Sequence, residues 1–380
     1  MPANPRLYPL DYPADEQDGE LLALDTAILT LRVQARDTAL KQSHTRRIGG
    51  QNAIQVQNKI SRARPVPMPL SQVGARSLPL TGIQGTLAIL AGGRGHGVST
   101  ETIAFYYSNE SAKATGVRLS ELRNYMGTIG DASVGIFAGG IAASGLSMAM
   151  DEISYKKMTT RRLGSNLSVS RFAIAGIGNK DIGVLMGGAK RSDGGVLATG
   201  EVYTYATGTM QATSLITARQ ASHNGTSNPT DGFVYGGSTD VFVGAQPLTS
   251  IERYNFATRT SSAVGAALST PHTVHSAFGN KVKGYVAGGL GFASTISRLV
   301  YSGLTVSVVG NMTEGKVCSD GASNNQSGYM IGGDMASTSW RGTRTIDKLN
   351  FASEAIARLG SLLPTEMADQ GAVSDYGAGL

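Results

Sequence analysis

The most regular feature of the chain is a short apolar or aromatic run that ends in two glycines and occurs six times. The segments are TLAILAGGRG, VGIFAGGIAA, IGVLMGGAKR, GFVYGGSTD, GYVAGGLG and GYMIGGDMA. Their paired glycines are Gly92 and Gly93, Gly139 and Gly140, Gly187 and Gly188, Gly236 and Gly237, Gly288 and Gly289, and Gly332 and Gly333. Successive pairs are 47, 48, 49, 52 and 44 residues apart, which indicates a repeat protein whose units pack against one another.

A second apolar pattern follows each pair of glycines after 11 to 18 residues. It consists of two apolar or aromatic residues spaced i, i+2: Phe105 and Tyr107, Tyr203 and Tyr205, Tyr254 and Phe256, Leu299 and Tyr301, and Leu349 and Phe351. In the second repeat we place Tyr155 in the first of these positions and Lys157 in the other. Residues spaced by two share one face of a strand, so this spacing predicts a strand whose rings point into one layer.

A basic residue recurs before the next repeat, and a turn-forming residue follows it. The basic position holds Arg123, Arg171, Arg219, His272 and Lys316, with Met367 in the sixth place. Eight or nine residues later come Asp131, Asn179, Asn228, Asn280, Asn324 and Asp375, with small residues between. A Gly-Asn or Gly-Asp pair between apolar runs predicts a hairpin, because both residues tolerate positive φ.

Each repeat therefore contains four predicted strands in about 48 residues: a small-residue strand, the strand ending in Gly-Gly, the aromatic strand and a short fourth strand. This pattern predicts an all-β fold, a six-bladed β-propeller. Glycine at the end of the second strand would let the backbone of a neighbouring blade approach closely. The segment 367–375, MADQGAVSD, has no apolar strand after it, so we expect it to complete the first blade and close the ring.

This order of strands, with Gly-Gly and a basic residue at fixed places, resembles the kelch repeat over about residues 85–380. The usual tryptophan of the fourth strand is absent, and Trp340 lies in a loop. Propellers of this kind that are poor in Trp and rich in Ser, Thr and Gly look like those of tailed-phage structural proteins. The resemblance implies a virion component, a phage tail or fibre protein.

Residues 1–80 do not share the repeat, and we interpret them as an attachment or oligomerisation arm beside a propeller at 81–380. Leu24, Ile28, Leu31 and Ala35 could form one face of a short helix, although AILTLRV could instead be a strand. The polar, basic segment that follows favours an extended arm. Ordering such an arm costs about 1–2 kcal/mol per residue, which docking on a partner or on identical subunits would offset. A disordered tail or a cover on the propeller is the alternative.

Composition adds few constraints. The chain has 380 residues, 41% of them hydrophobic and 16% charged, with a net charge of +6. The basic residues are concentrated only between positions 32 and 80, and we do not expect a nucleic-acid partner. One cysteine, Cys318, excludes internal disulfides. The N-terminus has no signal-peptide pattern and no run is long enough to span a bilayer, so we expect synthesis in the host cytoplasm.

The sequence indicates no catalytic residue, no metal and no cofactor. His272 and His275 are three apart in a predicted strand and would face opposite sides, which is the wrong geometry for a shared metal. Kelch propellers include copper radical oxidases, but no Cys, Tyr and His set of that kind stands out. GGRGHG at 92–97 lacks the Lys-Ser/Thr of a phosphate loop.

The best-defined polar set is the recurring basic position: Arg123, Arg171, Arg219, His272 and Lys316. We consider it as a ring that could bind an anionic ligand, or as residues that bond to carbonyl groups of the neighbouring blade. The expected function is that of a non-enzymatic virion protein, anchored by residues 1–80 and binding a host-surface glycan or protein, or other subunits, as a homo-oligomer. A sugar-acting enzyme and a cytosolic kelch-type interaction module are the alternatives.

Overall fold

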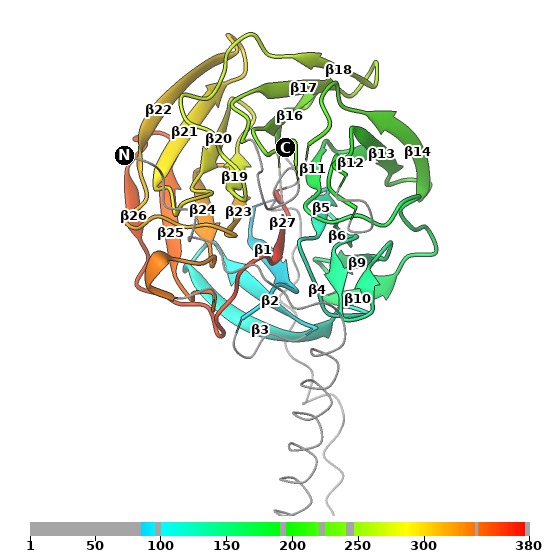
Figure 1. The fold of residues 1–380 in the computed structure, drawn as a ribbon. Helices are drawn as coiled ribbons and strands as arrows, with labels where there is room; N and C mark the ends of the chain where they lie inside the picture. Colours follow the sequence, from blue (N-terminus) through cyan, green and yellow to red (C-terminus); the bar gives the residue numbers. More distant parts are fainter. Residues whose placement is uncertain are drawn as a thin grey trace, which may run out of the picture. The chain divides into compact units, whose positions relative to one another are not determined.

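The computed structural model describes residues 85–95, 100–190, 195–219, 225–240, 247–338 and 341–376. The chain divides into two units, Met1–Ala75 and Arg76–Leu380, and the described residues all belong to the second. Within them the regular elements are β-strands, apart from one short 3-10 turn, η2 (Ala336–Thr338). The sheets are arranged around a central axis (Figure 1), so the prediction of an all-β, propeller-type fold is confirmed. The arm predicted for residues 1–80, with its helix, lies outside the described residues.

Six of the sheets have four antiparallel strands, and we number them along the chain. Sheet 1 contains β27 (Gly371–Ser374), β1 (Leu87–Ala91), β2 (Glu101–Tyr106) and β3 (Ser111–Arg118). Sheet 2 contains β5 (Gly127–Gly130), β6 (Val134–Ala138), β9 (Met150–Ser154) and β10 (Thr159–Arg162). Sheet 3 contains β11 (Ala175–Gly178), β12 (Ile182–Met186), β13 (Thr199–Thr204) and β14 (Thr209–Ser214).

The other three sheets follow the same order. Sheet 4 contains β15 (Thr226–Ser227), β16 (Asp231–Tyr235), β17 (Ile251–Asn255) and β18 (Thr260–Ala263). Sheet 5 contains β19 (Ser276–Gly279), β20 (Lys283–Ala287), β21 (Thr295–Val300) and β22 (Thr305–Asn311). Sheet 6 contains β23 (Asp320–Ser323), β24 (Ser327–Ile331), β25 (Ile346–Asn350) and β26 (Ile356–Arg358). A small extra sheet joins β4 (Arg123–Asn124), β7 (Ile141–Ala142) and β8 (Gly145–Leu146).

Sheet 1 is built from both ends of the described chain. The C-terminal strand β27 pairs with β1, for example through Ala88 with Ser374 and Ala91 with Gly371. The carboxylate of Asp375 accepts hydrogen bonds from the backbone N–H groups of Thr86 (2.8 Å) and Leu87 (3.1 Å). These contacts replace, without a covalent connection, the turn that joins the first two strands of every other sheet.

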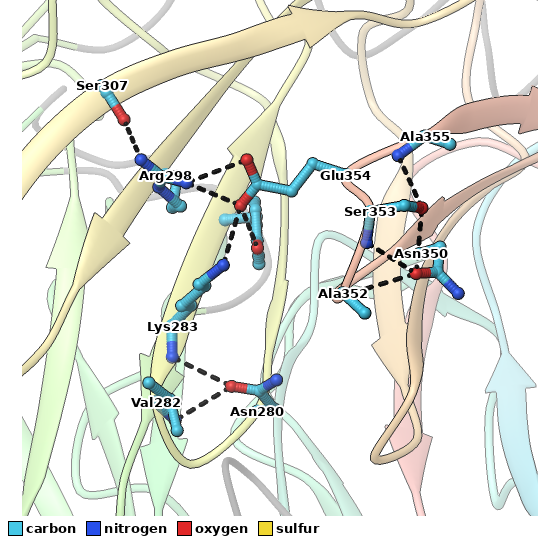
Figure 2. Close-up of polar contacts among 11 residues, drawn as sticks. Asn280, Val282, Lys283, Arg298, Ser307, Asn350, Ala352, Ser353, Glu354 and Ala355 are labelled. Atoms are coloured by element: carbon cyan, nitrogen blue, oxygen red, sulfur yellow. Dashed lines mark hydrogen bonds and ion pairs between the residues drawn. The ribbon is translucent and has the colours of Figure 1, made fainter.

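The recurring Asn or Asp closes its turn in a way that the sequence analysis did not predict. The Asn280 side-chain oxygen accepts from the N–H groups of Val282 and Lys283, both at 2.9 Å (Figure 2). Asp131, Asn179, Asn228 and Asn324 make the same pair of bonds. None of these residues has positive φ in the described structure. Our expectation of a positive-φ turn is therefore wrong, and a side-chain acceptor holds the turn instead.

The paired glycines have the close backbone contacts that the pattern predicted. All twelve have positive φ, between 48° and 122°. A Cβ on Gly139 would lie 2.7 Å from the carbonyl oxygen of Arg171, on the segment that leads into sheet 3. A side chain at this position would push neighbouring sheets apart.

The hydrophobic core is divided into layers between neighbouring sheets. Phe105 and Tyr107 of sheet 1 contact Tyr329 of sheet 6, with ring centroids 4.9 and 5.2 Å apart. Tyr155 is the second member of its i, i+2 pair and not the first, as we had assigned it. Ile153, two residues earlier, pairs with Gly135 as Tyr203 pairs with Gly183. Tyr155 thus corresponds to Tyr205. The loop after Gly139 and Gly140 is two residues shorter than our assignment assumed, which explains the wrong alignment.

The propeller has two different faces. On one face, which we call the turn face, short turns join the first to the second and the third to the fourth strand of each sheet. On the other, the loop face, lie the longer connections after each Gly-Gly and the links to the next sheet. Gly85 and Tyr376, where the described chain begins and ends, both lie on the turn face, beside the start of β1.

Neighbouring sheets are also joined at the turn face by the hairpin between the third and fourth strands. Glu354, in the hairpin of sheet 6, reaches back to sheet 5 (Figure 2). Its carboxylate accepts from Arg298 (2.8 Å), Lys283 (3.0 Å) and the Tyr285 hydroxyl (2.9 Å). Glu110, in the hairpin of sheet 1, contacts Tyr329 and Lys348 of sheet 6 in the same way.

Candidate functional site

The recurring basic residues lie on the links that lead from one sheet into the next, and they are buried. Their exposed fractions are 0% for Arg123, Arg219, His272 and Lys316 and 1% for Arg171. The main chain turns inward at this point, toward the first strand of the new sheet. The structure thus brings these five side chains to equivalent places, but inside the molecule.

Each basic side chain bonds to the sheet that follows it. Arg123 donates from Nη1 to the carbonyl oxygens of Gly139 (2.9 Å) and Ala149 (2.6 Å), and it pairs with Asp151 through Nη2. Arg171 bonds Gly187, Thr199 and Glu201, Arg219 bonds Gly236, Ser250 and Glu252, and Lys316 bonds Thr345 and Asp347. This geometry joins the end of the second strand to the start of the third.

The backbone of the same residue joins the preceding sheet. The N–H group of Gly140 donates to the carbonyl oxygen of Arg171 at 2.9 Å. Equivalent bonds of 2.8 or 2.9 Å connect Gly93 to Arg123, Gly188 to Arg219, Gly237 to His272, Gly289 to Lys316 and Gly333 to Met367. Each residue of this position therefore holds two sheets together, one through its backbone and the other through its side chain.

Sequence reasoning missed the acidic partners of these cations. Asp151, Glu201, Glu252 and Asp347 are all buried and lie on the third strand. Each lies two residues before the first member of the apolar i, i+2 pair of its repeat, where Ile153 is the first member in sheet 2. A carboxylate at this constant position before the pair is the sequence signal from which these acidic partners could have been predicted.

The two positions change together from sheet to sheet. Where the base is His272, the partner is the Ser297 hydroxyl, 3.2 Å from Nε2. Where the base is replaced by Met367, the corresponding residue of sheet 1 is Ile103, and both belong to one apolar cluster. A buried charge is costly unless it is paired, so charge is present either at both positions or at neither.

Burial governs the titration of these groups. It lowers the pKa of Arg123, Arg171, Arg219 and Lys316, although the paired carboxylates oppose that shift. Burial also lowers the pKa of His272, which the bond to the Gly288 carbonyl opposes in part. The five residues present no surface to a ligand. The alternative interpretation, bonding to carbonyl groups of the neighbouring sheet, matches the observed contacts.

A second ring of residues surrounds the axis on the loop face. Tyr125, Ala173, Val274, Cys318 and Asp369 each follow the basic position by two residues and have φ between 54° and 60°. Backbone N–H groups donate from Tyr125 to Asp369, from Ala173 to Tyr125, from Cys318 to Val274 and from Asp369 to Cys318. We call these five residues the collar. Their left-handed backbone lets each first strand turn inward while it bonds its neighbour around the axis.

A charged cluster lies at the collar, where sheets 6 and 1 meet. The Arg94 side chain pairs with both Asp334 and Asp369, whose carboxylates are fully buried. Asp334 also accepts from the Gly342 N–H at 2.6 Å. Burial raises the pKa of Asp334, although Arg94 opposes the shift. Arg94 is one quarter exposed, so this cluster is the described ionic group that solvent reaches at the collar.

The axis itself contains a narrow cavity of about 60 Å³. The first strands of all six sheets line it, mainly with Gly, Ala, Ser and Thr residues such as Gly176, Ser227 and Ala322. A Cβ on Gly176 would lie 1.7 Å from the Thr128 carbonyl oxygen. The small residues thus let six strands meet around one axis, and the remaining space suits water rather than a larger molecule.

The two described histidines are arranged differently from our expectation. The rings of His272 and His275 lie edge to face, with centroids 6.1 Å apart, instead of on opposite sides. They precede β19, and Val274 between them has positive φ, so the alternation of a strand does not apply. Within the described residues, no group of three or more His, Cys, Asp or Glu side chains could hold a metal ion. Cys318 is buried, and burial raises the pKa of its thiol.

The described residues contain no helix that is long and apolar enough to cross a membrane.

Comparison with known proteins supports the fold and leaves the function open. No protein-family model matches the chain, and no curated protein matches it. Among solved structures, the chain is similar to one described as the structure of YjhT, with a TM-score of 0.54 and 10% sequence identity. The match covers 66% of this chain and 88% of the other. At this identity the similarity shows a β-propeller-type fold alone, so function must be argued from this chain's own residues.

Proposed function

We propose that residues 81–380 form a six-bladed, kelch-like β-propeller that serves as a non-enzymatic structural protein of a virion, a phage tail or fibre component. Residues 1–80 attach it to the particle or to identical subunits. The propeller binds a host-surface glycan or protein, or a neighbouring subunit. The phage assignment rests on the resemblance of the repeats to kelch-like proteins of tailed phages.

The observation that carries this proposal is the difference between the two faces. The described chain enters at Gly85 on the turn face, whereas the loops after each Gly-Gly lie on the opposite face. The loops differ in length and sequence, while the sheets beneath them are fixed by the buried pairs of Arg123, Arg171, Arg219 and Lys316. A rigid scaffold whose described chain begins on one side and whose variable loops lie on the other suits display and recognition.

The first test is the molar mass in solution, by light scattering, of the full chain and of residues 81–380. We expect a defined oligomer for the full chain and a monomer for the shorter chain, with circular dichroism used to verify that both contain folded sheet. Two monomers would contradict assembly through residues 1–80. Immunodetection of the protein in purified particles then tests the virion assignment separately.

The Arg94 cluster favours one second candidate, an enzyme that acts on a sugar bound on the loop face beside the collar. The guanidinium group of Arg94, one quarter exposed, offers donors for hydroxyl groups, and the buried carboxylates of Asp334 and Asp369 hold it in place. A sugar that raised the melting temperature of the wild type, but not of Arg94→Met, would support this candidate. A shift of equal size in both proteins would contradict it.

A further inference from the structure

The turn face carries exposed charge that is mostly of one sign. Six charged residues at the tips of its turns are exposed: Lys156, Lys157, Lys180, Asp181, Arg259 and Lys281. Five of them are basic, and the single acid, Asp181, pairs with Lys180 next to it. They belong to sheets 2, 3, 4 and 5, which follow one another around the axis. The basic tips therefore occupy one sector of this face, over four consecutive sheets.

The other acidic groups of the turn face do not neutralise this sector. Glu354 points back to the preceding sheet, where it bonds Arg298 (Figure 2). Glu110 bonds Lys348 of the preceding sheet in the same way. Asp131 and Asp375 accept from backbone N–H groups of their own turns. These carboxylates are bound within the structure, so the exposed lysines and arginine determine the sign of the surface potential.

The basic tips are held on short, fixed turns. The Asn179 side-chain oxygen accepts from the N–H groups of Asp181 and Ile182, which fixes the backbone of the turn that carries Lys180. Asn280 fixes the turn that carries Lys281 in the same way. A surface that is already ordered loses little entropy when it binds a partner.

The surroundings of the charges indicate the class of partner. The residues that begin the hairpins, such as Tyr155, Phe256 and Tyr301, are buried against the sheets, so these rings offer no stacking platform for bases. Val282 is the large apolar residue that is exposed on the described turns. A single such side chain buries too little apolar surface for insertion into lipid. Because the sector is rich in lysine and its turns are held by side-chain hydrogen bonds, it suits carboxylates that an extended chain presents one after another.

We propose that the turn-face sector formed by Lys156, Lys157, Lys180, Arg259 and Lys281 is a docking surface for an acidic polypeptide segment. The amino-acid sequence contains one segment of this chemistry. Residues 11–20, DYPADEQDGE, have five carboxylates and no basic side chain. We take this segment of a second copy of the chain as the occupant, which rests on the assembly proposed above and adds a specific contact to it.

The test uses the full chain with Asp11, Asp15, Glu16, Asp18 and Glu20 replaced by the corresponding amides, so that its own segment does not compete. The probe is a fluorescent peptide of sequence DYPADEQDGE, and its amide counterpart is the control peptide. Binding is followed by fluorescence anisotropy at about 50 mM salt, where exposed charges are weakly screened. We expect binding of the acidic peptide that weakens as salt is added.

A matched pair of variants locates the surface. Lys156→Ser/Lys157→Ser/Lys281→Ser is expected to bind the peptide about tenfold more weakly, since three exposed charge pairs are lost. Arg118→Ser/Arg162→Ser/Arg341→Ser removes the same charge from exposed residues outside the turns and should bind normally. Equal loss in both variants, or no binding at all, would overturn the proposal. Tighter binding of duplex DNA or of phosphatidylserine vesicles would also overturn it, in favour of those partners.

Discussion

At the scale of single residues, the repeated polar positions explain how a chain rich in Gly, Ser and Thr holds its sheets together. Arg171 contacts sheet 2 through its carbonyl oxygen and sheet 3 through its guanidinium group. The paired Glu201 also accepts from the backbone N–H and the hydroxyl group of Ser168. A side chain that looked like a ligand contact in the sequence is therefore part of the core.

The apolar pair of sheet 1 suggests how to test the ionic pairs. Arg171→Met leaves Glu201 buried without its cation, and we expect a loss of about 3–5 kcal/mol in the free energy of unfolding. Arg171→Met/Glu201→Ile copies the Met367 and Ile103 pair and should recover much of that loss. Urea unfolding of the two variants, and of Glu201→Ile alone, gives the coupling energy. Additive effects of the two substitutions would contradict direct pairing.

His272 makes the stability of the propeller depend on pH. Burial holds its pKa below the ordinary value of 6.5, so the unfolded state binds a proton at a higher pH than the folded state does. Stability from this residue is therefore present above about pH 6.5 and decreases as the pH falls toward the folded pKa. Between pH 7.5 and pH 5.5, the melting temperature of His272→Gln should fall less than that of the wild type. Parallel melting curves would show that His272 does not titrate in this way.

At the scale of elements, the hairpin between the third and fourth strands fixes the distance between neighbouring sheets. One residue of each hairpin has positive φ. It is Glu110, Met158, Arg259, Leu304 or Glu354 in five sheets and Gly208 in the other. Polar residues there bond polar partners, as Glu354 bonds Arg298, and Met158 and Leu304 pack on apolar clusters. The same backbone position thus joins sheets by different chemistry.

Glu354 and Arg259 give a matched comparison, because both have positive φ in equivalent hairpins. Glu354→Ala removes bonds from Arg298, Lys283 and Tyr285 and should lower the free energy of unfolding by about 1–3 kcal/mol. Arg259→Ala, on an exposed tip, should change it by no more than about 0.5 kcal/mol. Chemical denaturation measures both. Equal effects would mean that backbone strain, and not the side-chain contact, determines the cost.

At the scale of the whole molecule, the ring is closed by non-covalent contacts at one place. Asp375 takes the role that Asn or Asp has in the covalent turns and accepts from Thr86 and Leu87. Asp320 accepts from the Ala372 N–H at 2.6 Å, and the Tyr107 hydroxyl donates to Ser374 at 2.9 Å. The C-terminal strand is therefore bound both to sheet 1 and to sheet 6.

Closure predicts different results for two substitutions of Asp375. Asp375→Asn keeps the acceptor found in four of the covalent turns, and we expect a melting temperature close to that of the wild type. Asp375→Ala leaves buried N–H groups without an acceptor and should cost about 1–3 kcal/mol, measured by denaturant unfolding. Deletion of 366–380 removes β27 and should cause unfolding or aggregation. A truncated chain as stable as the wild type would contradict closure by this strand.

The amino-acid sequence by itself determined the period, the order of the strands, the all-β propeller-type fold and the need for Gly-Gly, because these depend on local spacing and backbone sterics. It did not determine that a side-chain oxygen closes each turn, where Tyr155 belonged or what the basic residues contact. Those features depend on contacts between residues far apart in the chain. Only the tertiary structure brought Arg123 to Asp151 and Asp375 to Thr86, because burial decides whether a charge is paired inside or left to bind a ligand.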